Sequence, residues 1–570
     1  MYLRKTTNKK TGRTYLALAR SYHDKTTKTT RAQIVESLGC LEELRKTYPD
    51  PIAYYTEVVR KMNAEEAETK KPELLEYDKA ARLPDDAAER NIGYAVLSAV
   101  YHWLGLDVFF NSRQRSIDAE YNINSVVKLL VYSRILRPGS KLRAYSGKGW
   151  FFDKTDFEAH DVYRALTHIA QMAADTQLWI HRKILERRGR DMSFMYYDVT
   201  NYYFEIDEED SLRRKGVSKE HRPDPIVQMG LLMDNGGIPV SYKLFPGNNN
   251  DCTTLVPMLA DIRRKYDAGK VVVVADKGMN TGSNAYYIAN GRGWYIFSQT
   301  VRAGTKELKR FVLNETGYEW IGKDFKRKSR QHTRHVKIEQ DDGKPPIEAT
   351  ISEKQVVFYS RDYDRKAKND REKVIAKAND IVRSPDKYNK YNTYGAAKYI
   401  KHLEYDDKTG EIIQAKSKIS FDMEKLREDE KYDGYYLIVS NCFDKEDEWI
   451  IEKYRGLWEI EENFRVTKSE LEARPVFVSR QDHIEAHFLT CFIALVVMRL
   501  IQKQLGRAYS PEVIIDNLSR ACCAHIDTNR YMAFYYNEAL KKIGEQYGID
   551  FGKKYWTLRE ITKMIGCTKK

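Results

Sequence analysis

Three acidic residues stand at positions where a carboxylate could do chemistry. Asp198 ends the run FMYYD and Asp276 ends the run VVVVAD, so each follows a stretch typical of a buried strand. A carboxylate beside a buried strand costs free energy unless it is paired, hydrogen-bonded or bound to a metal ion. Functional groups in α/β sheets collect at the carboxyl ends of strands. The alternative is that each aspartate caps the turn or helix that follows it.

The third acid, Glu461, lies in IEKYRGLWEIEENFRVTKSEL, a segment with a helical pattern. At about 100° per residue, one helical face would carry Glu461 together with Tyr454, Trp458, Arg465 and Lys468. The alternative, an exposed Glu–Arg pair at i, i+4, would contribute only ~0.3–0.5 kcal/mol to stability and would not explain the aromatic residues on the same face. The pattern favours a metal-binding carboxylate followed by side chains that grip phosphate.

The spacing of Tyr454, Glu461 and Lys468 resembles the YREK signature, Tyr-x2-Arg-x3-Glu-x6-Lys, of a large group of bacterial insertion-sequence transposases. The Arg position of the signature is Leu457 in this chain. Three further segments are similar, in the same order, to the first- and second-acid regions of that group: YYDVTNYYFE, KEHRPDPIVQMGLLMDNGGIPVSYKLFPGNNND and VVVVADKGMN. The chain looks most like the long branch of the group, which has a basic N-terminal β module.

This resemblance implies a DDE DNA transposase with an α/β, RNase H-like catalytic core interrupted by a β-rich insertion. Asp198, Asp276 and Glu461 would be its catalytic acids and would hold Mg²⁺ or Mn²⁺, two ions per active site. Such an enzyme cleaves DNA at the ends of the element and joins the 3′-OH ends to target DNA. We expect Arg465 to supply the phosphate contact that Leu457 cannot make.

The distribution of charge predicts a polyanionic partner. The chain has 96 Lys and Arg against 82 Asp and Glu, which gives a net charge of +14. Such a charge favours DNA binding, because cations that neutralise DNA phosphates release the counterions of the DNA. The first 31 residues hold nine Lys or Arg against one acid, Asp24, and residues 323–337 hold seven against Asp324. The alternative is an ordinary basic protein. The predicted DNA-binding residues are Tyr454, Arg455, Arg465, Lys468, Lys326, Arg327, Lys328 and Arg330.

Other features exclude several classes of protein. The seven cysteines contain no CxxC pair, so neither a zinc knuckle nor a disulfide framework is indicated. His483 and His487 lack a third ligand of suitable type and are more typical of helix packing or DNA contact than of zinc. The longest apolar run, Phe488–Met498, is shorter than the ~20 residues that a bilayer requires, so it predicts a buried helix. We expect a cytoplasmic, nucleoid-associated protein of a bacterium or archaeon with no membrane partner.

The elements that must position the acids follow from changes in hydrophobic period. Short strand patterns surround Asn235-Gly236-Gly237, a hairpin signal, while residues 300–430 are highly charged and foreign to a buried sheet. The predicted organisation is a basic DNA-binding β module (1–45), a linker or exposed helix (46–90), a helical DNA-binding and pairing domain (91–190), the first half of the core (191–300), a β-rich basic insertion (301–430), the second half of the core (431–505) and a C-terminal helical region (506–570).

Our interpretation is a cut-and-paste DNA transposase that binds the terminal repeats of its element and acts on double-stranded DNA as a homodimer. One alternative is a metal-dependent RNase H-like nuclease that cuts without strand transfer, because the same acids serve both reactions. The other is a non-catalytic DNA-binding derivative, which loss of any of the three acids would have favoured.

Overall fold

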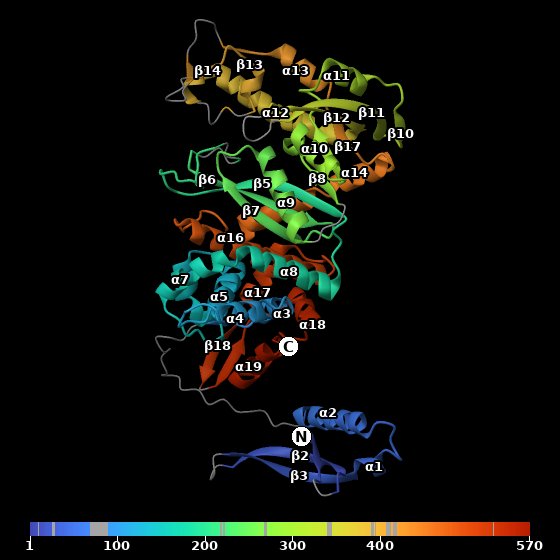
Figure 1. Cartoon of the computed structure of the whole chain (residues 1–570). Helices are drawn as coiled ribbons and strands as arrows, with labels where there is room; N and C mark the ends of the chain where they lie inside the picture. The colour runs from blue at the N-terminus through green and yellow to red at the C-terminus, as the bar shows by residue number, and fades with distance from the viewer. Residues whose placement is uncertain are drawn as a thin grey trace. The chain divides into compact units, whose positions relative to one another are not determined.

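The computed structural model describes residues 1–8, 11–24, 29–68, 89–216, 219, 223–266, 271–338, 345–388, 393, 395–405, 412–413, 419–527 and 529–569 (Figure 1). The chain forms two compact units, Met1–Asp85 and Asp86–Lys570. The first unit is an antiparallel sheet of β1 (Tyr2–Thr7), β2 (Thr14–Asp24) and β3 (Thr29–Cys40) with α1 (Leu41–Leu44) and α2 (Pro51–Glu68). Leu16, Leu18 and Val59 form part of its buried core. Helix α2 lies in the range that we predict as linker or exposed helix, and β1 packs against it.

The second unit is built around a nine-stranded sheet in the order β10-β11-β12-β17-β9-β8-β5-β6-β7. Its central strands are β5 (Phe194–Tyr203), β6 (Ile226–Asp234), β7 (Pro239–Pro246), β8 (Val272–Ala275) and β9 (Trp294–Gln299). Strands β5, β8 and β9 are parallel, and β6 is antiparallel to both β5 and β7. This order and polarity are those of an RNase H-like core, so the predicted fold class is confirmed.

The hairpin at Asn235-Gly236-Gly237 joins β6 to β7 as its sequence predicts. Gly237 has φ +80°, a left-handed conformation that glycine adopts without steric cost. Asp234 accepts hydrogen bonds on Oδ1 from the backbone N–H groups of Gly236 and Ile238, and Arg190 binds its Oδ2 at 2.7 Å. The hairpin is therefore fixed at its turn by a buried ion pair.

Successive side chains of β5 point to opposite faces of the sheet and enter two separate cores. Met195, Tyr197 and Val199 pack in one core with α9 (Leu255–Lys265) and α10 (Gly282–Asn290). Tyr196 and Tyr202 pack in the other core with the helices of the opposite face. The sheet is thus covered on both sides, as the continuous apolar run VVVVA predicts.

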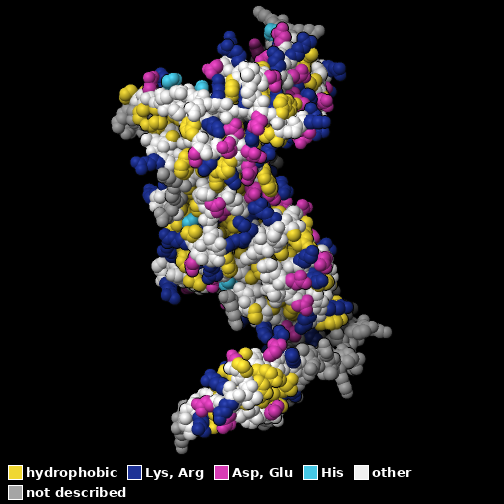
Figure 2. All heavy atoms as spheres, turned by 90° about the vertical axis from the view of Figure 1, so that its right-hand side faces the viewer, with side chains coloured by type: hydrophobic (Ala, Val, Ile, Leu, Met, Phe, Trp, Pro, Cys, Tyr) yellow, Lys and Arg dark blue, Asp and Glu magenta, His cyan; other side chains and the backbone are white. Residues whose placement is uncertain are grey.

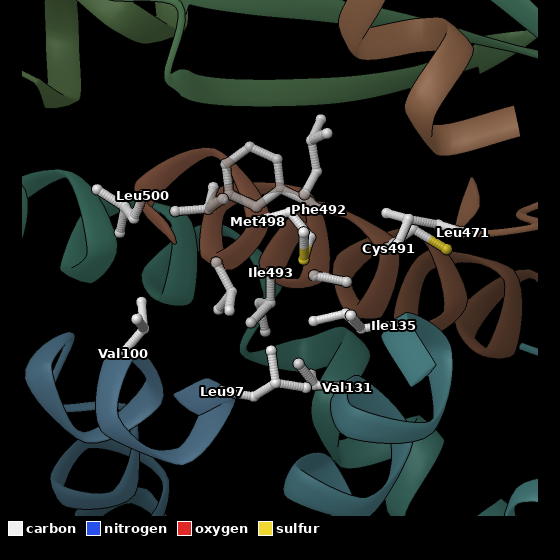
Figure 3. Packing of buried hydrophobic residues seen from close by; sticks show 14 of the residues in the cluster. Leu97, Val100, Val131, Ile135, Leu471, Cys491, Phe492, Ile493, Met498 and Leu500 are labelled. Atoms are coloured by element: carbon white, nitrogen blue, oxygen red, sulfur yellow. The ribbon is translucent and has the colours of Figure 1, made fainter. Parts of the chain in front are cut away.

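The long helix α16 (Gln481–Gln504) is the centre of the larger core. It contacts β7 on one side and α3, α5 and α7 on the other, and its Phe492, Ile493 and Met498 lie among side chains such as Leu97 and Val131 (Figure 3). This helix is long and apolar enough to cross a membrane, but 94% of its most apolar window is buried inside the protein. The prediction of a buried core helix is confirmed. The helices of residues 91–190 are α3 (Tyr94–Trp103), α4 (Leu106–Gln114), α5 (Ile123–Leu136), α6 (Lys141–Ser146), α7 (Ala159–Gln171) and α8 (Ala173–Arg188).

The segment 301–430 extends the central sheet and also forms two small two-stranded sheets of its own. Its strands β11 (Phe325–Ile338) and β12 (Ile347–Ser360) extend the central sheet through β17 (Tyr435–Ser440), and β10 (Glu319–Ile321) forms the edge. The extension forms because KQVVFYS supplies the apolar side chains that pair β12 with β17. The segment also contains α11 (Lys306–Leu313), the 23-residue α12 (Arg361–Arg383), α13 (Met423–Glu430) and the short strands β13 (Ile400–Lys401), β14 (Glu404–Tyr405), β15 (Ile412–Ile413) and β16 (Ser420–Phe421).

The C-terminal region is not purely helical. It holds a four-stranded sheet in the order β20-β19-β18-β4, whose edge strand β4 comes from Arg90–Asn91. Asn91 is buried and its side chain donates to the carbonyls of Leu518 and Ser519, which holds this pairing in place. The other elements are α17 (Pro511–Arg520), β18 (Cys522–Asp527), β19 (Arg530–Ala533), α18 (Glu538–Tyr547), β20 (Tyr555–Thr557) and α19 (Leu558–Cys567).

Candidate active site

Asp198 and Asp276 stand side by side on two parallel strands. Asp276 follows the last residue of β8, whereas Asp198 lies in the middle of β5, which continues to Tyr203 and does not end at Asp198 as the sequence predicts. Tyr197 of β5 pairs with Ala275 of β8, so the next position on each strand is one of the two aspartates. Side chains opposite each other on neighbouring strands leave the sheet on the same face. The sheet therefore brings together two acids that are 78 positions apart in the chain.

The capping explanation accounts poorly for Asp276. Asp276 precedes a 3₁₀ turn (Lys277–Met279), but its side chain makes no capping hydrogen bond to that turn. Its Oδ1 instead accepts a hydrogen bond from Ser298 Oγ on β9 at 2.9 Å, and the Tyr454 hydroxyl reaches the same oxygen at 3.4 Å. Two hydroxyl groups from other elements thus orient this carboxylate.

Asp198 lies in the electric field of the other two acids. The pKa of Asp198 is raised to about 6, chiefly because the carboxyl group is buried. The charge of Lys219 and the backbone N–H of Val199 lower this pKa, and the negative charges of Asp276 and Glu461 raise it. Two carboxylates that each oppose the ionisation of a third must lie near it. The three acids proposed from the sequence therefore influence one another electrostatically in the folded chain.

Glu461 reaches the site from a broken helix. The segment that we predict as one helix is α14 (Asp447–Arg455), α15 (Trp458–Arg465) and a π-helical turn (Val466–Glu470). The break falls at Gly456, where a Cβ would meet the Tyr196 hydroxyl oxygen at 2.4 Å. Tyr454 and Glu461 consequently lie on two successive helices, and both side chains still line one cavity.

Asp276 and Glu461 nevertheless line one cavity of about 450 Å³. Its wall is built from the sheet, from α14 and α15, and from α12 of the inserted segment, which contributes Tyr363 and Lys366. Leu457, which occupies the Arg position of the motif, is buried in this wall. A larger cavity of about 960 Å³ lies among residues 118–168, Arg480 and His483 and contains none of the three acids.

The chemistry of the three acids fits a hard divalent cation. Carboxylate oxygens are the ligands that Mg²⁺ prefers, and a bound cation would favour the ionised form of Asp198, whose pKa is raised chiefly by burial and further by the charges of Asp276 and Glu461. Within the described part of the chain, no three His, Cys, Asp or Glu side chains lie close enough together to hold a metal ion as a group. Mg²⁺ commonly uses one or two carboxylates and completes its shell with water and substrate phosphate, so an open arrangement suits it.

The motif cations differ in accessibility. Arg465 is exposed, and its guanidinium lies 3.9 Å from carboxylate oxygens of Glu462 and Glu470. Lys468 lies on the π-helical turn with its Nζ 5.6 Å from the ring centre of Tyr202. Arg455 stacks over Phe325 and Phe358.

Several cations of the basic run 323–337 are paired with acids within the protein. Lys326 and Lys328 are buried, Lys326 binds Glu315 at 2.6 Å, and Lys328 donates to backbone carbonyls. Arg327 lies 3.3 Å from Glu448, and Arg330 binds Glu307 at 2.8 Å. On the face in Figure 2, Lys and Arg side chains lie among Asp and Glu side chains rather than in one patch. Burial of Lys326 and Lys328 thus works against the predicted DNA contacts there.

Two polar residues that lie beside the acids, Ser298 and Lys219, are not among the residues predicted from the sequence. Ser298 is a polar residue inside the buried strand YIFSQ, a pattern that could have marked it. Lys219 lies in the loop between β5 and β6, and nothing in its spacing predicts that its charge reaches Asp198. His487 is buried against Lys141 and the carbonyl of Ala473, so it serves in packing.

Comparison with known proteins gives two family matches. Residues 214–497 match the transposase DDE domain, and residues 3–73 match the N-terminal domain of the IS1634 family of transposases. No curated protein matches the chain. The first match contains Asp276 and Glu461 and begins after Asp198.

Among solved structures, the chain is similar to a piggyBac transposase synaptic complex with hairpin DNA, with 8% identity, TM-score 0.32, and coverage of 80% of this chain and 75% of that chain. It is also similar to a Mos1 transposase paired-end complex with the left transposon end, with 11% identity, TM-score 0.14, and coverage of 38% and 60%. The two family matches together span more than half of the 570 residues. The chain belongs to the insertion-sequence transposases that carry a DDE domain.

Proposed function

We propose that this transposase cleaves DNA at the ends of its element and joins the released 3′-OH ends to target DNA, using Asp198, Asp276 and Glu461. The observation that carries the proposal is the placement of Asp198 beside Asp276 on adjacent parallel strands, with the charge of Glu461 acting on the carboxyl group of Asp198. The match of Tyr454, Glu461 and Lys468 to the YREK spacing favours that group, with Leu457 as its departure.

The acids would hold two Mg²⁺ or Mn²⁺ ions, which activate the attacking oxygen and stabilise the leaving oxygen of the phosphodiester. Ser298 and Tyr454 keep the carboxylate of Asp276 turned toward the cavity. Glu461 is exposed on α15, where DNA can approach it. Water is the nucleophile of the first cleavage, and the 3′-OH that it releases attacks a phosphodiester of the target, so each bond formed replaces one broken.

The partner in both steps is double-stranded DNA, first the terminal repeats and then the target. Arg465 and Lys468 follow Glu461 in the chain and are the cations that we assign to the DNA backbone. Two element ends require two active sites, so the working form is a homodimer on DNA. We therefore place the protein in the cytoplasm of a bacterium or archaeon, in association with the nucleoid.

The test uses a plasmid that carries the gene with its flanking genomic DNA, incubated with the purified chain and Mg²⁺. We expect cleavage at the element ends and joined products, and we expect Glu461→Gln to lower the cleavage rate by roughly 10²–10³-fold or more while DNA affinity is retained. The matched control is Glu452→Gln, which changes an exposed glutamate of α14. Cleavage without joined products would favour the nuclease, and loss of DNA binding with Glu461→Gln would contradict the catalytic role of Glu461.

A further inference from the structure

The amine of Lys219 reaches the part of β5 that carries Asp198. Lys219 lies in the loop between β5 and β6, and its Nζ donates a hydrogen bond to the backbone carbonyl of Val199, the residue that follows Asp198. The same Nζ lies 4.0 Å from Oδ2 of Asp251. Lys219 is therefore held between the middle of β5 and a second segment of the chain.

That second segment is itself fixed. Asp251 opens a 3₁₀ turn (Asp251–Thr254) that follows β7, and Asn250 caps this turn. Gln228 of β6 donates to the carbonyl of Asn249 at 2.7 Å, and Asn284 of α10 donates to the carbonyl of Cys252 at 2.9 Å. Asp251 is thus a carboxylate on an anchored turn, and it gives the amine of Lys219 a defined position.

These contacts leave part of the amine available to a ligand. An ammonium group has three N–H donors. Among the described residues, the partners of Lys219 Nζ are one carbonyl within hydrogen-bond distance and one carboxylate at 4.0 Å, which is too long for a hydrogen bond. The side chain of Lys219 remains 45% exposed. A cation with spare donors consequently lies at the open edge of the acid cluster.

A lysine beside the acid cluster, in addition to the metal ions that the acids would hold, favours the approach of DNA. Asp198, Asp276 and Glu461 are all negative when ionised and repel a phosphate. A lysine beside them offers the compact point charge that proteins use to bind phosphate oxygens. Lys277, which directly follows Asp276, also lines the cavity, and Lys219 is a second lysine beside the acids.

We propose that Lys219 is a substrate-binding residue of the active site, whose ammonium group contacts a non-bridging oxygen of a DNA phosphate next to the cleaved bond, and that Asp251 is its positioning residue. This inference rests on the proposed function and deepens it. The competing explanation is that Lys219 is only an internal counter-ion for Asp198 and Asp251.

The experiment measures single-turnover cleavage of an end-labelled duplex that carries one element end, with saturating protein and Mg²⁺. The variants are Lys219→Met, which removes the charge, Lys219→Arg, which keeps it, and Lys215→Met, a control at an exposed lysine of the same loop. Each protein is tested on duplexes in which one phosphate at a time is replaced by a neutral methylphosphonate. Circular dichroism and the dissociation constant for the unmodified duplex show whether each variant is folded and binds DNA.

We expect Lys219→Met to slow cleavage by about 10- to 100-fold, because a charge-assisted hydrogen bond is lost, and Lys219→Arg to recover most of the rate. At one phosphate, the methylphosphonate should slow the wild-type chain by a similar factor and leave Lys219→Met unaffected. Lys215→Met should behave as wild type at every phosphate.

Two results would overturn the inference. One is a cleavage rate of Lys219→Met equal to that of wild type. The other is that each methylphosphonate slows Lys219→Met by the same factor as it slows the wild-type chain, at every position. This result would mean that Lys219 contacts no single phosphate and acts as an internal counter-ion. Absence of cleavage by the wild-type chain with Mg²⁺ would overturn the proposed function itself.

Discussion

Ser298 Oγ donates a hydrogen bond to Asp276 Oδ1 at 2.9 Å, across the neighbouring parallel strands β9 and β8. The backbone carbonyl of Ser298 in turn accepts a hydrogen bond from the side chain of Asn280, and Asn280 binds Arg334 of β11 at 2.7 Å. A chain of polar contacts therefore links the inserted segment to the second acid. The carboxylate of Asp276 is held in orientation by this chain and by Tyr454.

Replacing Ser298 with alanine should slow cleavage without unfolding the protein. The variant loses one hydrogen bond to a charged acceptor, worth about 1.5–3 kcal/mol, so we expect a rate about 10- to 100-fold lower at saturating DNA. The matched control is Ser440→Ala, which removes a buried serine of β17 that bonds to the N–H of Cys442 and not to an acid. Equal rates for the two variants would show that Ser298 does not orient Asp276.

The basic residues can be separated by the salt dependence of DNA binding. Arg465→Ala removes an exposed charge, so it should weaken binding and reduce the slope of log affinity against log salt by about one. Lys326→Met should leave this slope unchanged, because the Lys326 ammonium is buried beside Glu315 and the rings of Tyr318 and Trp320. A reduced slope for Lys326→Met would mean that the inserted segment opens on DNA.

The core strands and the placing of both aspartates beside them could be predicted because each strand contains a short apolar run, although β5 continues past Asp198 to Tyr203. The hairpin at Asn235-Gly236-Gly237 and the buried helix over Phe488–Met498 are confirmed for the same reason. These features depend on residues close together in the chain, which is the range over which hydrophobic period is informative.

The parts that could not be predicted depend on contacts between distant segments. The helix break at Gly456 follows from the approach of Tyr196, 260 positions earlier, and the extension of the sheet by β11 and β12 follows from pairing of β12 with β17. The contact of Lys219 with Val199 likewise depends on how the loop between β5 and β6 folds back. No local pattern encodes such approaches.

The buried pair of Asp234 and Arg190 should be a main support of the β6–β7 hairpin. The side chains are 4% and 0% exposed, so Asp234→Ala leaves an uncompensated guanidinium and two unpaired N–H groups in the core. Breaking such a pair costs about 3–5 kcal/mol, so we expect a lower melting temperature by differential scanning calorimetry. Asp207→Ala, at an exposed aspartate, is the control, and an equal melting temperature for the two variants would contradict this role.

Lys141 should make the stability of the protein depend on pH. Its amine is buried 3.0 Å from Nδ1 of His487, and burial, with the nearby charge of Arg134, lowers its pKa from 10.5 to about 7. Between pH 7 and pH 10.5 the unfolded chain therefore binds a proton at Lys141 that the folded chain does not bind. Stability consequently rises with pH across this window, by at most about 1.4 kcal/mol per pH unit from this group.

Lys141→Met fills similar volume with no group to protonate, so it should raise the melting temperature at pH 7 more than at pH 9. We expect the melting temperature of the wild-type chain to rise from pH 7 to pH 9 and that of Lys141→Met to change less. Lys154→Met, at an exposed lysine, should keep the wild-type dependence. If the melting temperature of Lys141→Met depended on pH as that of the wild-type chain does, Lys141 would have to stay protonated in the folded chain. Its ammonium group would then donate a hydrogen bond to Nδ1 of His487, whose Nε2 is bonded to the carbonyl of Ala473.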